Sequence, residues 1–209
     1  MTGAYPKRIV FFIWYFTVRP RDAFRWLYFL ISKNKVIDAC VPWMTWRAID
    51  FFNKNIKQGM KIFEYGAGGS TLFFLKKGCL VTSIENSKEW KELVERKAYY
   101  LSLAHNLNLR FFPANRQDQE ILLRYIQSVN DGGPWDVIIV DGIPEVRIEC
   151  IHEAIKNITP TGMLVLDDAN WERFKKVPVI LRDWKRLKFI GLGPERRGVS
   201  ETDIYFKTL

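Results

Sequence analysis

Apolar runs and amphipathic segments alternate through most of the chain. Five apolar runs predict β-strands at 60–66, 79–86, 108–114, 135–142 and 162–170. Segments with helical spacing follow the first four runs, at 70–78, 87–105, 118–130 and 145–158. Strands that alternate with helices across short connections form a mostly parallel sheet with helices on both faces. The pattern therefore predicts an α/β protein.

The end of the chain breaks this alternation. A helix is predicted at 171–184, with an interruption near Pro178, and two further strands at 187–193 and 202–209. Only a short polar segment separates these two strands, so they are expected to pair antiparallel at one edge of the sheet. The complete prediction is a Rossmann-like, doubly wound sheet of seven strands.

The first 40 residues differ from the rest in charge and in aromatic content. Ten aromatic residues fall within residues 1–31, and residues 1–35 hold seven Lys and Arg against one acid, which is +6 of the chain's net +9. The apolar run at 9–18 is about half as long as a bilayer span. We therefore predict a helical, basic and aromatic N-terminal extension at 1–40 and a main domain at 41–209.

Two roles are open for this extension. Aromatic rings and long cationic side chains suit an anionic membrane surface, and the same side chains could instead pack on the main domain. Nucleic acid is disfavoured as a partner, because no recognised binding motif accompanies the basic residues. The expected location is cytoplasmic, peripheral at the membrane if residues 1–35 bind its surface.

A helix is predicted at 41–59, where apolar residues recur at helical spacing. Its expected core face holds Trp43, Trp46, Ile49, Phe52 and Ile56. The three cysteines, Cys40, Cys79 and Cys150, lack any paired spacing and are predicted to be free, buried thiols.

Carboxylates stand at the ends of four of the five predicted strands. They are Glu64, Glu85, Asp141 and the pair Asp167 and Asp168. The carboxyl ends of parallel strands share one edge of a sheet, which is where ligands of such folds bind. The pattern therefore predicts an acidic rim around a ligand site.

A glycine-rich turn, "GAGGS", follows Glu64 and points to the class of ligand. The third glycine of a dinucleotide-binding loop is missing, and so is the Gly-Lys-Ser/Thr of a phosphate-binding loop. A carboxylate beside the turn would repel phosphates and attract an ammonium group. Glu85, nineteen residues after Gly66, is placed to bind both hydroxyls of a ribose. A ligand with a ribose and an amino group but no phosphate is S-adenosylmethionine.

With these features, the chain resembles the class I S-adenosylmethionine-dependent methyltransferases. "FEYGAGGST", "VTSIEN", "WDVIIVDG" and "GMLVLDDANW" are similar to successive motifs of that family, and "FIGLGP" with "TDIYF" to its last strand pair. The resemblance covers about residues 41–209. It implies that Gly66, Ala67, Gly68, Gly69, Ser70 and Asn86 line the cofactor, with Glu64 near its amino group and Glu85 on its ribose. Asn115 and Asp118 are implied at the adenine edge.

Within that family, "VDG" followed by "VLDDANW" resembles the small-molecule O-methyltransferases that bind Mg²⁺ between their fourth and fifth strands. The resemblance implies Asp141, Asp167 and Asp168 as metal ligands, although the histidine that commonly follows "DG" in that group is absent. Alternatively, Asp167 and Asp168 cap the following helix. Arg147 is predicted to bind an anionic group of the substrate, and Asp141 and Arg147 are the candidate catalytic residues.

The function expected from these features is methyl transfer to an oxygen or nitrogen of a small molecule or of a glycan or lipid precursor. Such a reaction requires alignment of the acceptor with an activated methyl group more than it requires acid–base groups. Three alternatives stay open at this point. They are a nicotinamide-dependent oxidoreductase, an aminopropyltransferase on the same fold, and a non-catalytic interaction module with a degenerate pocket.

Overall fold

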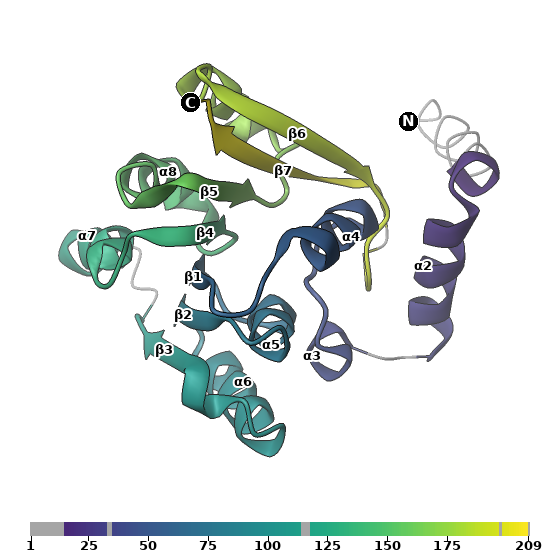
Figure 1. Cartoon of the computed structure of the whole chain (residues 1–209), viewed down its shortest axis with the longest axis horizontal. Coiled ribbons are helices and arrows are strands. Elements are labelled where there is room, and N and C mark those ends of the chain that lie inside the picture. The colour runs from purple at the N-terminus through teal and green to yellow at the C-terminus, as the bar shows by residue number, and fades with distance from the viewer. Residues whose placement is uncertain (1–14, 33–34, 114–117, 197, 209) are drawn as a thin grey trace.

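A seven-stranded sheet forms the centre of the computed structural model, which describes residues 15–32, 35–113, 118–196 and 198–208. The strand order is β3-β2-β1-β4-β5-β7-β6 (Figure 1). Neighbouring strands from β3 to β5 are parallel, whereas β7 pairs antiparallel with both β5 and β6. The strands are β1 (Lys61–Tyr65), β2 (Leu80–Glu85), β3 (Leu107–Phe111), β4 (Trp135–Val140), β5 (Ile158–Leu166), β6 (Trp184–Gly191) and β7 (Ser200–Lys207). The predicted Rossmann-like sheet is confirmed.

Helices cover both faces of this sheet. One face carries α4 (Trp46–Asn55), α5 (Gly69–Lys76) and α6 (Lys88–Tyr100), with α3 (Val36–Ala39) against α5. The other face carries α7 (Gln119–Gln127), α8 (Arg147–Ala154) and α9 (Val177–Ile180). The 3₁₀ turns are η1 (Ala104–Asn106), η2 (Ser128–Asn130), η3 (Pro144–Val146) and η4 (Glu172–Phe174). Helix α2 (Pro20–Ser32) lies at one end of the molecule (Figure 1).

Alternating side chains of the central strands build two separate cores. In β1, Ile62 joins the core under α4 and α5, while Phe63 joins the core under α7 and α8. In β4, Val137 and Ile138 divide between the cores in the same way. Successive residues of a strand point to opposite faces, so a central strand covered by helices must be apolar at nearly every position. This requirement explains the unbroken apolar runs of the sequence.

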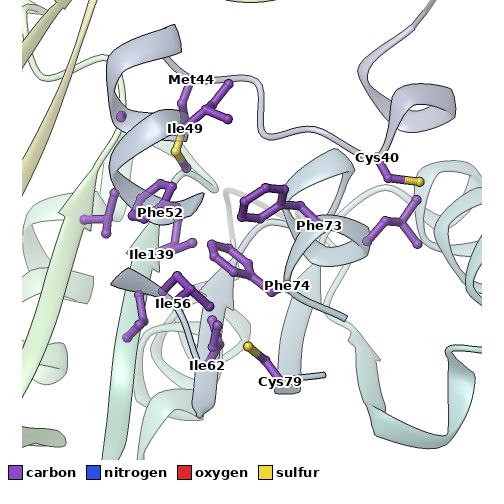
Figure 2. Close-up of a cluster of buried hydrophobic side chains, with 14 of the residues drawn as sticks. Cys40, Met44, Ile49, Phe52, Ile56, Ile62, Phe73, Phe74, Cys79 and Ile139 are labelled. Carbon is purple, nitrogen blue, oxygen red and sulfur yellow. The ribbon is translucent and has the colours of Figure 1, made fainter. Parts of the chain in front are cut away.

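The core beneath α4 and α5 is packed by aromatic rings (Figure 2). Phe52 of α4 and Phe74 of α5 are fully buried, and their rings meet edge to face with centroids 5.7 Å apart. Ile62 of β1 and Ile139 of β4 lie in the same cluster. Cys40, Cys79 and Cys150 are free and buried, as predicted.

The predicted helix at 41–59 is shorter in the structure and begins only at Trp46. Residues before Trp46 are held outside the helix because the Trp46 backbone N–H donates to the carbonyl of Leu192, 2.9 Å away. Trp43 is consequently 50% exposed, so its placement on the core face was wrong. Trp46, Ile49, Phe52 and Ile56 are buried as predicted.

The predicted helix at 171–184 is replaced by two short pieces, η4 and α9. Pro178 stands at the start of α9, a position that proline favours because its missing N–H has no helical partner there. Strand β6 then begins at Trp184, three residues earlier than predicted, and β7 begins at Ser200. The last two strands do pair antiparallel, with β6 at the sheet edge.

The described part of the N-terminal extension packs on the main domain through one side. Tyr15 is buried and donates to Asp22, and Trp26 and Phe29 pack against the core that contains α4. Ile37 and Cys40 belong to that core themselves. No helix in the described ranges is long and apolar enough to cross a bilayer.

Truncation of Phe52 to alanine should lower the free energy of unfolding by about 3–5 kcal/mol, because a fully buried ring leaves a cavity between α4 and α5. Tyr99→Ala is the matched control, since Tyr99 is 81% exposed and its loss should change stability by less than about 0.5 kcal/mol. Urea unfolding of both variants measures the difference. Equal losses would show that the aromatic cluster is not the core of this domain.

Candidate functional site

A pocket of about 420 Å³ opens at the carboxyl ends of the central strands. Nearly all of the predicted site residues line it: Glu64, Gly66, Ala67, Gly68, Gly69, Ser70, Glu85, Asn86, Asp141, Arg147 and Asp168. Further lining residues that the sequence analysis did not assign to the site are Val36, Trp43, Trp90, Ile139, Gly142, Ile143, Pro144 and Arg196. Glu64, Glu85, Asp141 and Asp168 of the predicted acidic rim therefore share one pocket, and their binding roles stay predictions.

Two predicted residues, Asp167 and Asp118, lie elsewhere. Asp167 is fully buried behind the pocket wall. Asp118 caps α7 and accepts hydrogen bonds from the backbone N–H groups of Glu120 and Ile121 at 3.0 and 3.1 Å. Asn115 lies outside the described residues. The adenine contacts expected of Asn115 and Asp118 stay predictions.

The glycine turn is fixed by two close approaches. Gly66 has φ +97°, and a Cβ there would lie 3.4 Å from the backbone of Asp141. At Gly69 a Cβ would lie 2.1 Å from the carbonyl oxygen of Val41, so this glycine lets the segment before α4 pack on the turn. The turn therefore joins β1 to β4 on one side and to the chain after α3 on the other.

Glu64 is the most buried of the acids that line the pocket. Its Oε2 accepts hydrogen bonds from the hydroxyls of Thr71 at 2.6 Å and Ser83 at 2.8 Å. Its Oε1 is buried and has no hydrogen-bond partner among the described residues. Burial raises the pKa of Glu64 to about 7, against the lowering effect of the nearby hydroxyls of Ser70, Thr71 and Ser83. One oxygen of this buried carboxyl group thus lacks a hydrogen bond, and the Ser70 hydroxyl is near the group.

Glu85 is held differently, by backbone donors alone. Its Oε2 accepts from the N–H of Ala67 at 3.0 Å, and its Oε1 accepts from the N–H groups of Asn86 and Ser87, each at 2.8 Å. These bonds tie the end of β2 to the glycine turn and fix the orientation of the carboxylate. Three of the roughly four acceptor sites of the carboxylate are thus used, and one on Oε2 is left for a ligand's hydroxyl.

Arg147 is buried at the opposite side of the pocket. Its guanidinium donates to the carbonyls of Gly142, Asp167 and Asp141 at 3.1, 2.9 and 2.8 Å, and to Asp141 Oδ1 at 2.9 Å. These bonds join the ends of β4 and β5. A bidentate contact with a substrate anion, as the sequence predicted, would have to replace bonds that this side chain already makes. The observed geometry makes Arg147 a positioning residue for Asp141.

The predicted Mg²⁺ site contains an arginine. Arg196 forms ion pairs with the carboxylates of both Asp167 and Asp168. The other oxygen of Asp167 accepts from the Thr202 hydroxyl at 2.7 Å, and Asp141 is paired with Arg147. No set of three or more His, Cys, Asp and Glu side chains suited to a metal occurs in the part of the chain that the structure describes. The three acids do not fit Mg²⁺ as ligands, because guanidinium groups already neutralise them.

Burial also disfavours charge on these acids. It raises the pKa of Asp167 to about 7, where Arg196 acts in the opposite direction and Asp141 and Asp168 add to the rise. Burial likewise raises the pKa of Asp141, against the lowering effect of Arg147 and Arg196. The Asp141 side chain is nonetheless 36% exposed, so one side of this carboxylate is open to the pocket. Such a carboxylate can accept a proton from a group bound in the pocket.

Arg196 and Trp43 are the functional candidates that the sequence analysis missed. The Arg196 guanidinium donates to the Trp43 carbonyl at 2.6 and 3.2 Å and lies 5.8 Å from the centroid of the Trp43 ring. Both come from segments whose local sequence resembles an ordinary polar connection or a helix start. No sequence motif predicts that Arg196 pairs with Asp167 and Asp168, or that it bonds to Trp43.

No family model matches the chain, and no curated protein matches it. Many solved structures do share its fold. An S-adenosylmethionine-dependent O-methyltransferase from Thermotoga maritima superposes with a TM-score of 0.61 at 13% identity, over 84% of this chain and 72% of that one. The O-methyltransferase TomG from Streptomyces achromogenes, solved with S-adenosylmethionine, gives 0.59 at 16% identity, over 73% and 74% of the two chains.

An rRNA methylase from Streptococcus thermophilus superposes with a TM-score of 0.56 at 14% identity, over 77% of this chain and 93% of that one. Identities this low establish the fold and nothing finer. The fold is therefore that of the Rossmann-like class I methyltransferases, and it serves acceptors of different kinds in these neighbours.

Calorimetric titration of Mg²⁺ into the protein should show no binding. The Arg196→Ala variant should gain a site, because removal of the guanidinium leaves the carboxylates of Asp167 and Asp168 without their cation. Arg182→Ala is the control, since the Arg182 side chain is 79% exposed. Circular dichroism checks that the variants are folded. Mg²⁺ binding by the unaltered protein that Asp168→Ala abolishes would restore the predicted metal site.

Proposed function

We propose that the protein is an S-adenosylmethionine-dependent methyltransferase that acts on an oxygen, or alternatively a nitrogen, of a small molecule or of a glycan or lipid precursor. The observation that carries this proposal is the buried Glu64 Oε1, which lacks a donor in a pocket built by a glycine turn. An ammonium group supplies the missing donors and a compensating charge. The structural neighbour TomG, which was solved with S-adenosylmethionine, supports the choice of ligand.

Each side chain has a proposed role toward the cofactor. Glu64 binds the amino group of its methionine part, and Glu85 binds the ribose hydroxyls. The turn Gly66, Ala67, Gly68, Gly69 and Ser70, together with Asn86, lines the space between them. Asn115 and Asp118 are the proposed adenine contacts. We retain the division of the chain into an extension at 1–40 and a cofactor-binding domain at 41–209 as part of the proposal.

Methyl transfer requires few chemical steps from the protein's own side chains. S-adenosylmethionine supplies a methyl group that its sulfonium already activates. The side chains must align the acceptor with that group and exclude water, for which the apolar wall of Trp43, Ile143 and Pro144 is suited. Asp141 takes the proton that the acceptor loses, and Arg147 keeps the Asp141 carboxylate in place. No metal takes part in this scheme.

The composition of the N-terminal extension is the reason for proposing a glycan or lipid precursor as the methyl acceptor. A basic and aromatic segment beside the pocket suits an acceptor presented at an anionic membrane surface, which is why a glycan or lipid precursor is named. A cytoplasmic location with peripheral attachment belongs to the same proposal.

Thermal shift with a panel of ligands separates the proposal from its alternatives. S-adenosylhomocysteine should stabilise the protein, whereas NAD should not, and decarboxylated S-adenosylmethionine should act more weakly. Stabilisation by NAD alone would indicate an oxidoreductase, and preference for the decarboxylated compound an aminopropyltransferase. A protein that responds to none of the three would be an interaction module.

Glu85→Ala should weaken S-adenosylhomocysteine binding by at least about tenfold, because hydrogen bonds to a charged group are each worth roughly 1.5–3 kcal/mol. Isothermal titration calorimetry measures the change. Glu92→Ala, an exposed position on α6, serves as control and should bind as the unaltered protein does. Unchanged affinity in Glu85→Ala would remove the ribose contact from the proposal.

The pH dependence of binding tests the role of Glu64. Its pKa near 7 means that the carboxyl is protonated below this pH, so binding an ammonium there must first release a proton. Affinity for S-adenosylhomocysteine should therefore fall by up to about tenfold for each pH unit below 7. In Glu64→Gln this dependence should be absent. Affinity that rises toward low pH would contradict the contact.

In the ligand-free protein, the raised pKa of Glu64 should make folding stability depend on pH. The folded pKa of Glu64, about 7, exceeds the ordinary value of 4.5, so the folded state holds this proton more tightly than the unfolded chain does. The contribution of Glu64 to stability is then full below about pH 4.5 and is lost as the pH rises to 7. Urea unfolding of the protein and of Glu64→Gln across this range measures it.

A further inference from the structure

Helix α2 carries apolar side chains on two opposite sides. The inner side, with Ala23, Trp26 and Phe29, packs on the main domain. The outer side exposes Phe24 (71%), Leu27 (39%), Tyr28 (60%) and Ile31 (71%). Their spacing of three, four and seven residues places them on one face of the helix. A contiguous exposed apolar stripe of this kind is unusual on a soluble surface and marks an interaction site.

A basic cleft lies beside the first turn of the same helix. It has a volume of about 440 Å³ and is lined by Arg19, Arg21, Arg47 and Lys54, with Val18, Pro20, Phe51 and Phe189 as its apolar wall. Of its two acids, Asp50 is paired with Arg25 at 2.9 Å, whereas Asp22 accepts from the neutral Tyr15 hydroxyl and keeps its charge, so four cations face one uncompensated acid. None of the four cations is paired with a carboxylate in the described part of the chain. The cleft therefore has charge available for an anion.

The cleft and the stripe form one continuous surface. Arg21 lines the cleft and precedes Phe24 by three residues, so both lie on the same face of α2. We name the four cations of the cleft and the four side chains of the stripe the docking surface. It combines positive charge at one end with exposed aromatic and aliphatic groups along a helix.

We propose that the docking surface binds an anionic phospholipid bilayer, with a lipid phosphate in the cleft and the stripe inserted at the headgroup boundary. Helices that lie in a membrane interface have this composition, and their binding adds apolar burial to attraction by anionic lipids. The aliphatic side chains of Leu27 and Ile31 offer nothing to nucleic acid bases. A second copy of the chain is disfavoured as occupant, because its own basic cleft would be repelled.

The side of α2 that faces away from the stripe, and the chain just after α2, contact residues of the pocket and its border. The Trp26 indole N–H donates to the carbonyl of Arg196 at 2.6 Å, and the Val36 N–H donates to Glu195 Oε2 at 3.0 Å. Arg196 and Val36 line the pocket. Helix α2 thus stands between the proposed bilayer and residues of the pocket. This deepens the proposed function, on which it rests, by favouring an acceptor attached to a lipid.

Vesicle co-sedimentation of the full chain tests the proposal. The protein should pellet with vesicles of phosphatidylglycerol and phosphatidylcholine, less as salt rises, and should not pellet with phosphatidylcholine alone. Arg47→Gln with Lys54→Gln should weaken binding by about 30-fold, at roughly 1 kcal/mol for each cation. Ile31→Ser should weaken it by roughly tenfold through lost apolar burial.

Matched controls separate binding by the docking surface from non-specific effects of surface charge and exposed apolar side chains. Lys175→Gln with Lys176→Gln removes two other exposed cations, and Val179→Ser removes an apolar side chain that is 70% exposed, against 71% for Ile31. Both controls should bind vesicles as the unaltered protein does. Equal vesicle binding by all variants, or no binding to anionic vesicles, would overturn the proposal. So would RNA binding by the unaltered protein that the docking-surface variants lose while their vesicle binding is unchanged.

Calorimetry with S-adenosylhomocysteine on the same variants keeps the two proposals apart. Retained cofactor binding shows that the variants are folded, so a loss of vesicle binding is then specific to the docking surface. Vesicle binding without cofactor binding would reject the methyltransferase while leaving the docking surface in place.

Discussion

A buried carboxylate with one oxygen left without a donor is expensive to maintain, and the rest of this site depends on one such group. Glu64 stands at the end of β1, where the hydroxyls of Thr71 and Ser83 satisfy one of its oxygens. The other oxygen has no partner among the described residues, and burial alone costs a polar group roughly 1–3 kcal/mol. A fold retains such a cost where a ligand removes it. The glycine turn, the carboxylate of Glu85 and the pocket wall are all arranged around that point.

On the opposite side of the pocket, arginine side chains of the protein itself compensate the charge of the buried acids. Asp141, Asp167 and Asp168 meet at the ends of β4 and β5, and three carboxylates so close require positive charge. Arg147 and Arg196 supply it from within the protein. In the proposed function, a cationic group of the ligand is therefore expected on one side of the pocket, at Glu64, and none on the other. Asp141 remains accessible enough to accept a proton.

Local patterns predicted the sheet, the glycine turn and the acids, because strand periodicity and strand-end positions are properties of short stretches. Arg196 escaped prediction because its position depends on β7 entering the sheet between β5 and β6, which carries the connection between β6 and β7 over the acids. Trp43 escaped for a similar reason, since the bond from Trp46 to Leu192 delays the start of α4. Arg147 was identified from its position. Three of its four bonds go to Gly142 and Asp141, five and six residues earlier, but the fourth depends on the end of β5 lying beside β4, which brings the Asp167 carbonyl within reach. Long-range contacts of this kind leave no periodic signal in the sequence.

The crystal structure of the protein with S-adenosylhomocysteine is the most direct test of the account. The ligand's amino nitrogen should lie within hydrogen-bond distance of Glu64 Oε1, with the ribose hydroxyls at Glu85. A ligand bound outside this pocket, or one whose amino group avoids Glu64, would contradict it.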